Sequence, residues 1–171
     1  MTKGEPYSAG NVSRSPHGKR IAFDAQRNPD LGSSSTQTIY LLDLADRHVK
    51  ELIESAGPNG NPKWSPDGKK IVFTTFNGNP FFSYTNRYVA VVPADGGQLR
   101  LVPHEFAEDA NLIGWRPDGI YFGAQRNTAA HVFRADAATK VVRRITGPDA
   151  FLARARHSPR TTAPCPAPRG A

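Results

Sequence analysis

The sequence predicts an all-β protein: a partial β-propeller of about three four-stranded antiparallel blades, followed by a disordered C-terminal tail. The first observation is a phrase of the type Ser-Pro-Asp-Gly that recurs about every 50 residues, with prolines at Pro16, Pro66 and Pro117. The second is that short apolar runs bounded by turn residues follow every copy. The third is the content of 15 glycines and 15 prolines, which suits many tight turns.

The repeated phrase predicts a turn that leads into a buried strand. Its copies occupy residues 15–23, 65–73 and 116–122. Proline presets φ, aspartate can bond its own backbone, and glycine accepts a positive φ. The apolar run that ends each copy is short and rich in β-branched and aromatic residues, which favours a strand over a helix. The first copy is the most degenerate, because it has His17 where the other two have aspartate.

Two further strands complete each unit. A second apolar run lies at residues 39–44, 88–92 and 132–136, and a closing strand at 49–53, 98–102 and 141–146. Together with the strands on either side of the turn, these make four strands per unit, the arrangement of a propeller blade. The predicted blades span residues 11–55, 61–102 and 112–146. A β-sandwich is the alternative, since it also has short, regularly spaced strands, but three copies in phase favour the propeller.

The segments outside residues 11–146 lack the repeat. We expect residues 1–10 to form a leader and residues 147–171 to form an irregular, proline- and arginine-rich tail. Closed propellers have about four to eight blades, so three blades predict a piece of a larger protein. A stop or frame shift near residue 153 is our hypothesis for the tail. Unpaired blade edges should favour self-association, which sedimentation would detect.

Composition limits the classes of function. The net charge is +7, and the four arginines beyond Asp149 supply much of it. Residues 1–149 show no stripe of basic residues interleaved with aromatics, so the sequence does not predict nucleic-acid binding. No apolar run of about 18 residues predicts a membrane span. The only cysteine, Cys165, excludes an intrachain disulfide. Residues 1–7 do not resemble a signal peptide, so the chain as written is cytoplasmic, or periplasmic or secreted if a parent carried a signal.

We find no candidate catalytic residue, metal ligand or cofactor motif. Ser8 stands in half of a nucleophile elbow without a following helix, and His104-Glu105 begins a zinc-protease pattern that Glu108 breaks. The candidate binding residues are four aromatics in the loop at residues 75–86, which joins the second and third strands of blade two: Phe76, Phe81, Phe82 and Tyr84. They are predicted either to contact a partner or to fold back on their own blade. Asn77, Asn79, Asn86 and Arg87 are weaker candidates for a polar groove.

The repeat resembles a known family. Residues 64–73, with the closing Arg144-Ile145-Thr146, resemble the TolB-type propeller repeat over residues 11–146. This repeat occurs in TolB translocation proteins and in the N-terminal propellers of prolyl-oligopeptidase-family serine peptidases. Residues 109–122 and the aromatic loop look more like the peptidase propellers. In that family a separate α/β-hydrolase domain carries the catalytic residues, and the propeller restricts access to short peptides.

Three functions compete. The first is a non-catalytic propeller segment that gates or docks the α/β-hydrolase domain of a serine peptidase. The second is a TolB-like module that binds other proteins across one propeller face. The third, a propeller lactonase, needs inward-facing acids around a metal, which the sequence does not offer. On the first two hypotheses the chain alone should hydrolyse no peptide or ester.

Overall fold

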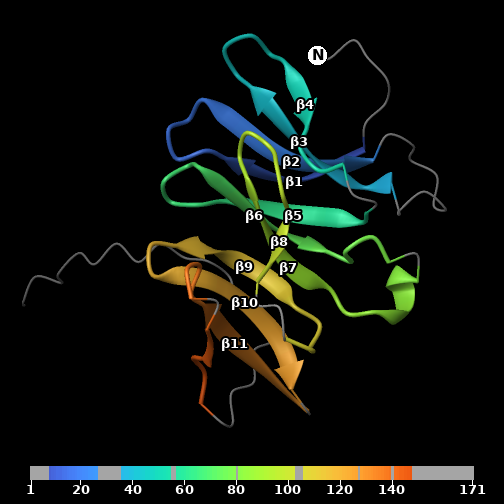
Figure 1. Ribbon diagram of the computed structural model, residues 1–171, viewed down its shortest axis with the longest axis vertical. Coiled ribbons are helices and arrows are strands. Elements are labelled where there is room, and N and C mark those ends of the chain that lie inside the picture. The colour runs from blue at the N-terminus through green and yellow to red at the C-terminus, as the bar shows by residue number, and fades with distance from the viewer. Residues whose placement is uncertain are drawn as a thin grey trace, which may run out of the picture.

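The computed structural model describes residues 8–26, 36–54, 57–79, 81–102, 106–126, 128–139 and 141–147. These residues form three four-stranded antiparallel sheets stacked one on the next (Figure 1). The predicted all-β fold of three four-stranded blades is therefore confirmed. Residues 1–7 and 148–171, which include most of the predicted leader and tail, lie outside the described residues.

Each blade is a meander in which consecutive strands pair. Blade one contains β1 (Ser8–Arg14), β2 (Arg20–Gln26), β3 (Thr38–Asp43) and β4 (Val49–Glu51). Blade two contains β5 (Asn59–Trp64), β6 (Lys70–Thr75), β7 (Tyr88–Pro93) and β8 (Arg100–Leu101), with the 3-10 turn η2 (Phe82–Tyr84) before β7. Blade three contains β9 (Asn111–Arg116), β10 (Gly119–Arg126), β11 (Ala129–Ala135) and β12 (Val142–Arg144).

The first strand of each blade is its inner strand, because β5 packs against β1 on one side and against β9 on the other. Each inner strand carries an irregularity in its pairing with the next strand, and in β5 this lies between Gly60 and Lys63. Such a bulge bends the strand and re-aims its side chains. In β5, Asn61 has φ 53°, a left-handed conformation that asparagine tolerates better than most residues.

Two strands begin earlier than the sequence indicated. Ser8 and Ala9, expected in the leader, pair with Gln26 and Ala25, so β1 begins at Ser8. β5 begins at Asn59, two residues before the predicted start of blade two at residue 61. The bulge explains both extensions, since pairing resumes beyond it in residues that read as turn formers.

The Ser-Pro-Asp-Gly turn is held by its own side chains. In the second copy the Ser65 hydroxyl donates to the Asp67 carboxylate at 2.6 Å and accepts from the Lys70 N–H at 2.9 Å. The Gly68 N–H donates to the Ser65 carbonyl at 2.9 Å, and Gly68 has φ 68°. The same backbone bond occurs between Gly18 and Ser15 in blade one. Each inner strand is thus tied to its neighbour by a local turn.

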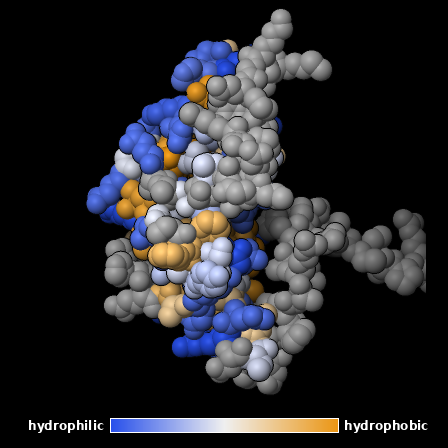
Figure 2. All heavy atoms as spheres, turned by 90° about the vertical axis from the view of Figure 1, so that its right-hand side faces the viewer, coloured by the Kyte–Doolittle hydropathy of each residue, from blue (hydrophilic) through white to orange (hydrophobic). Residues whose placement is uncertain are grey.

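The surface is mixed in hydropathy. On the side shown in Figure 2, hydrophobic surface is visible at mid-height between more hydrophilic regions. The large hydrophobic side chains that the described part of the chain exposes are scattered over the three blades: Val12, Leu44, Val49, Phe81, Tyr84, Val141 and Ile145.

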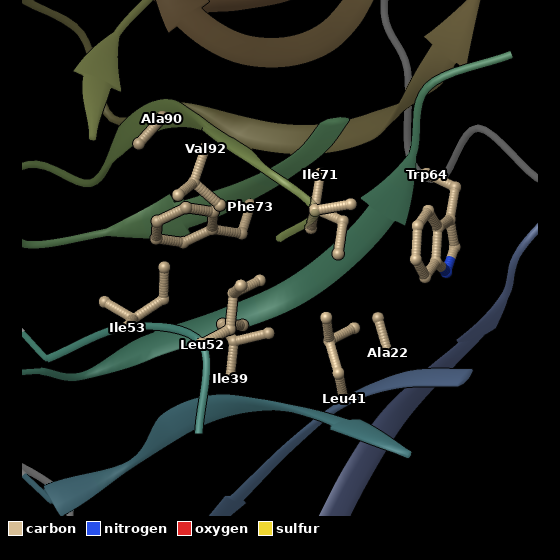
Figure 3. Close-up of a cluster of buried hydrophobic side chains, with 11 residues drawn as sticks. Ala22, Ile39, Leu41, Leu52, Ile53, Trp64, Ile71, Phe73, Ala90 and Val92 are labelled. Atoms are coloured by element: carbon tan, nitrogen blue, oxygen red, sulfur yellow. The ribbon is translucent and has the colours of Figure 1, made fainter. Parts of the chain in front are cut away.

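The core lies between the blades, not within a single closed barrel. Because side chains alternate along a strand, Ile71 and Phe73 of β6 face blade one while Val72 faces blade three. In Figure 3, Ala22, Ile39 and Leu41 of blade one point toward Ile71 and Phe73. The cluster between blades two and three contains Phe122 and Phe133, whose rings stack with centroids 5.8 Å apart. Blade two is therefore apolar on both faces, and its neighbours cover both.

Candidate functional site

Two hollows lie at opposite ends of the inner strands. The first, the Asp24 pocket, opens near Gly60 and Asn61 at the start of β5 and has a volume of about 500 Å³. The second, the turn pocket, opens near Lys63 and Trp64 at the end of β5 and has a volume of about 720 Å³. Both hollows take side chains from all three blades. They are thus the places where blade stacking, not one blade alone, builds a surface.

The Asp24 pocket is centred on a buried carboxylate. Asp24, on β2, is only 1% exposed, and its Oδ2 accepts from Asn11 Nδ2 at 2.8 Å and from the Asn61 N–H at 2.7 Å. Asn61 Nδ2 in turn donates to the Leu112 carbonyl of β9 at 2.9 Å. This chain of hydrogen bonds joins the three inner strands. A buried carboxylate is tolerated only when such donors surround it.

Glycines make room for this carboxylate. A Cβ at Gly10 would lie 2.3 Å from Asp24 Oδ1, and a Cβ at Gly60 would lie 3.2 Å from Oδ2. Asp24 Oδ1 itself has no hydrogen-bond partner among the residues that the structure describes. The repeat places Thr74 at the equivalent position of blade two, where its hydroxyl donates to the Gly60 carbonyl at 2.9 Å. Asp24 is thus a feature of blade one that the other blades lack.

The structure brings two of the four predicted loop aromatics to the Asp24 pocket. Phe76 and Phe82 line it and pack on each other with ring centroids 5.7 Å apart. Phe81 and Tyr84 are not among its lining residues, and their exposed fractions are 70% and 90%. The loop therefore has one pair turned inward and one pair free to contact a partner. A binding role for these four residues remains a prediction.

Arg87 also lines the Asp24 pocket, and Asp109 of the joint before blade three holds it there. Its Nη2 lies 2.6 Å from Asp109 Oδ2 and its Nε lies 3.0 Å from Oδ1. Hydrogen bonds from the Arg87 side chain, and from its backbone N–H, lower the pKa of Asp109 below its ordinary value. The pair links blade two to blade three and fixes one wall of the pocket.

The Asp109–Arg87 pair should make stability depend on pH in the acid range. Because the folded pKa of Asp109 is lowered, its contribution is present above the ordinary carboxyl pKa of about 3.9 and is lost as pH falls through the folded value. The Asp109→Asn variant should therefore be less stable than the parent at pH 7, with the difference shrinking below about pH 4. Urea unfolding at several pH values measures this. The exposed Glu54→Gln is the control, and a difference for Asp109→Asn that is constant with pH would contradict the prediction.

The turn pocket is cationic and aromatic. Arg14, Lys63 and Arg116 line it, together with Trp64, Trp115 and Tyr121. The Trp64 indole N–H donates to the Ser13 carbonyl at 2.9 Å, which ties the end of β5 to β1. Burial lowers the pKa of Lys63, and the charge of Asp24 partly opposes that shift. Lys63 thus lines the turn pocket and is still close enough to Asp24 to feel its charge.

Sequence analysis did not identify the turn pocket, although a signal for it exists. A basic residue precedes each repeat proline by one to three positions: Arg14 before Pro16, Lys63 before Pro66 and Arg116 before Pro117. Each blade alone presents one cation at the end of its inner strand. The cations meet in one pocket only because the three blades stack with their equivalent turns at the same end.

The described ranges contain no group of three or more histidine, cysteine, aspartate or glutamate side chains able to hold a metal ion. Among the same residues, no helix has the length and apolarity required to cross a membrane.

Three stacked four-stranded sheets, a shared turn and hollows along the inner strands define the class: the chain is a segment of a β-propeller. No family model matches the chain. It is 28% identical over 159 residues to dipeptidyl-peptidase 5 of Porphyromonas gingivalis, a match that covers 85% of the chain and 23% of that protein. It is 36% identical over 73 residues to the Tol-Pal system protein TolB of Hahella chejuensis, covering 41% of the chain and 16% of that protein. The chain thus spans less than a quarter of these relatives.

Solved structures show the same fold. The crystal structure of TolB from Acinetobacter baumannii matches with a TM-score of 0.66 and 23% identity, over 85% of this chain and 34% of that one. Acylaminoacyl peptidase and prolyl endopeptidases contain the same fold. The expected resemblance to TolB and to prolyl-oligopeptidase-family propellers is therefore confirmed for the fold.

Proposed function

We propose that this chain is a non-catalytic propeller segment of a prolyl-oligopeptidase-like serine peptidase, which provides a docking or gating surface for an α/β-hydrolase domain. The observation that carries the proposal is the match to dipeptidyl-peptidase 5 along 85% of the chain. Homologous propellers pair with an α/β-hydrolase domain in peptidases. The two hollows and the exposed pair Phe81 and Tyr84 are the surfaces available for such contacts.

The proposal is tested by supplying an α/β-hydrolase domain from a relative. The chain is co-expressed with the α/β-hydrolase domain of dipeptidyl-peptidase 5, tagged for purification, and hydrolysis of a chromogenic dipeptide and of a long unfolded protein is measured. We expect co-purification of the two proteins and slower cleavage of the long substrate, because a gate restricts access. The chain alone should hydrolyse neither substrate. Failure to co-purify, or turnover by the rigorously purified chain alone, would overturn the proposal.

A TolB-like interaction module is the second candidate. It is favoured by the 36% identity to TolB over 73 residues and by the TolB crystal structure. The coding sequence that surrounds this segment discriminates between the two. A downstream Gly-x-Ser-x-Gly segment supports the peptidase, because that motif presents the nucleophile of an α/β-hydrolase. Envelope-transport genes without that motif support the TolB-like module.

A further inference from the structure

We propose that the turn pocket is a docking site for an acidic peptide segment of a partner protein. A carboxylate of the segment enters between Arg14 and Lys63, and its apolar neighbours lie on the proline and tryptophan wall of the pocket. This inference rests on the proposed docking function and names the chemistry of the partner. It holds for a hydrolase domain and for a TolB-type partner alike.

The first argument is charge. Arg14, Lys63 and Arg116 line one pocket of about 720 Å³, and its lining in the described part of the chain contains no aspartate or glutamate. In the described part of the chain, no salt bridge joins Arg14 or Lys63 to an acid. Cations that converge in a concave site attract an anion, because the field is concentrated there.

The second argument is the desolvation of Lys63. Its side chain lines the turn pocket, and burial disfavours its charged form, with Asp24 offering only partial compensation. A carboxylate that binds beside it forms a charge-assisted hydrogen bond, which is stronger than a neutral one. The pocket thus gains more from an anion than an exposed lysine would.

The third argument separates a peptide from a nucleic acid. The cationic area is small, and the turns that carry Pro66 and Pro117 also carry the carboxylates of Asp67 and Asp118. Asp118 is already paired, with Tyr121 at 2.5 Å and Arg134 at 3.3 Å. A continuous phosphate backbone across this rim would meet these acids, whereas a single carboxylate side chain enters between them. The pocket wall of prolines, Ile113 and Trp115 suits apolar residues beside the acid.

Binding at this site can be followed by the intrinsic tryptophan fluorescence of the chain. It contains two tryptophans, and both Trp64 and Trp115 line the turn pocket. Tryptophan fluorescence of the whole chain is therefore measured during titration with a peptide of alternating glutamate and valine. We expect a saturable change that weakens as salt rises, because screening shortens the reach of surface charges. A glutamine–valine peptide of the same length should produce no saturable change.

Variants connect the signal to the residues. Lys63→Gln and Arg14→Gln should each weaken binding about ten-fold or more, because each removes a charged hydrogen bond. Lys63→Arg should bind within a few-fold of the parent. Arg100→Gln, on the outer strand β8 and exposed, is the matched control and should bind as the parent does. Circular dichroism verifies the fold of each variant, and the exposed Arg14 keeps the test valid if Lys63→Gln fails to fold.

Several results would overturn the inference. These are the absence of a saturable signal with the acidic peptide, equal binding of the glutamine peptide, and an equal loss in Arg100→Gln. If a single-stranded oligonucleotide bound more tightly than the acidic peptide, the partner of the pocket would be a nucleic acid and the inference would be wrong. The peptide titration uses no hydrolase domain. Its failure would therefore overturn this inference alone, and the co-purification test would still decide the proposed function.

Discussion

Replacing Phe73 by alanine should lower the free energy of unfolding by about 3–5 kcal/mol, the range measured for large-to-small changes of buried aromatics. Phe73 is 0% exposed and lies in the cluster that joins blades one and two (Figure 3). The variant loses the transfer energy of the ring and gains a cavity between two sheets, which cannot close without moving one blade against the other. Denaturant unfolding followed by circular dichroism measures the change.

Phe81→Ala is the matched control, since it removes the same ring from a site that is 70% exposed. Its unfolding free energy should stay within about 0.5 kcal/mol of the parent. Small domains have net stabilities of about 5–15 kcal/mol, so Phe73→Ala removes a large share, and Phe73→Leu keeps the test measurable if the alanine variant does not fold. Equal effects at Phe73 and Phe81 would show that the stacked-blade core is not the main source of stability.

Gly10→Ala should destabilise the chain by about 1–3 kcal/mol, the cost of overpacking a filled site. The added Cβ would lie 2.3 Å from Asp24 Oδ1, and Asp24 cannot retreat without breaking its bonds to Asn11 and Asn61. Asp24→Ala should cost about 1–3 kcal/mol by itself, because two donors then lose their acceptor. In the double variant the clash is gone, so the two losses should not add.

The double-mutant cycle measures this coupling, which we expect between about 0.5 and 3 kcal/mol. Gly114→Ala, in the inner strand of blade three, is the control, since a Cβ there would have no described atom within 4 Å. It should be neutral, or slightly stabilising because alanine restricts the unfolded chain. Additive losses for Gly10→Ala and Asp24→Ala would contradict the view that Gly10 makes room for the carboxylate.

The Asp24 network also explains why the inner strands behave as one unit. It joins β1, β2 and β5, and Asn61 extends the chain of hydrogen bonds to β9. The Trp64–Ser13 bond provides a second connection at the other end of β5. Both hollows are therefore bounded by inter-blade hydrogen bonds, which hold their lining residues in fixed positions. Such a frame suits a docking surface, because a preorganised site loses less entropy on binding.

The local sequence pattern was sufficient to predict the strands of the three blades. The turn phrase and the alternation of apolar residues indicated four strands per unit, and the strands after the turns lie where expected, for example β6 at Lys70–Thr75. The starts of β1 and β5 were not predicted. Around Gly60 the glycine, asparagine and proline residues are typical of a turn, but a bulge lets strand β5 continue through them. The loop aromatics were found as a group, but the pattern did not distinguish Phe76 and Phe82, which face the pocket, from Phe81 and Tyr84.

The order of residues along this chain determined the secondary structure, the turn chemistry and the propeller class, since these depend on contacts between neighbours in sequence. Only the stacking of the blades decided which side chains share a pocket. Asp24 and Asn61 are far apart in the chain, as are Arg14 and Lys63. The first pair shares a hydrogen bond and the second pair shares a pocket, because blades one and two bury their facing apolar surfaces. The physical reason is that hydrophobic burial between sheets fixes the relative position of inner strands, which no local propensity encodes.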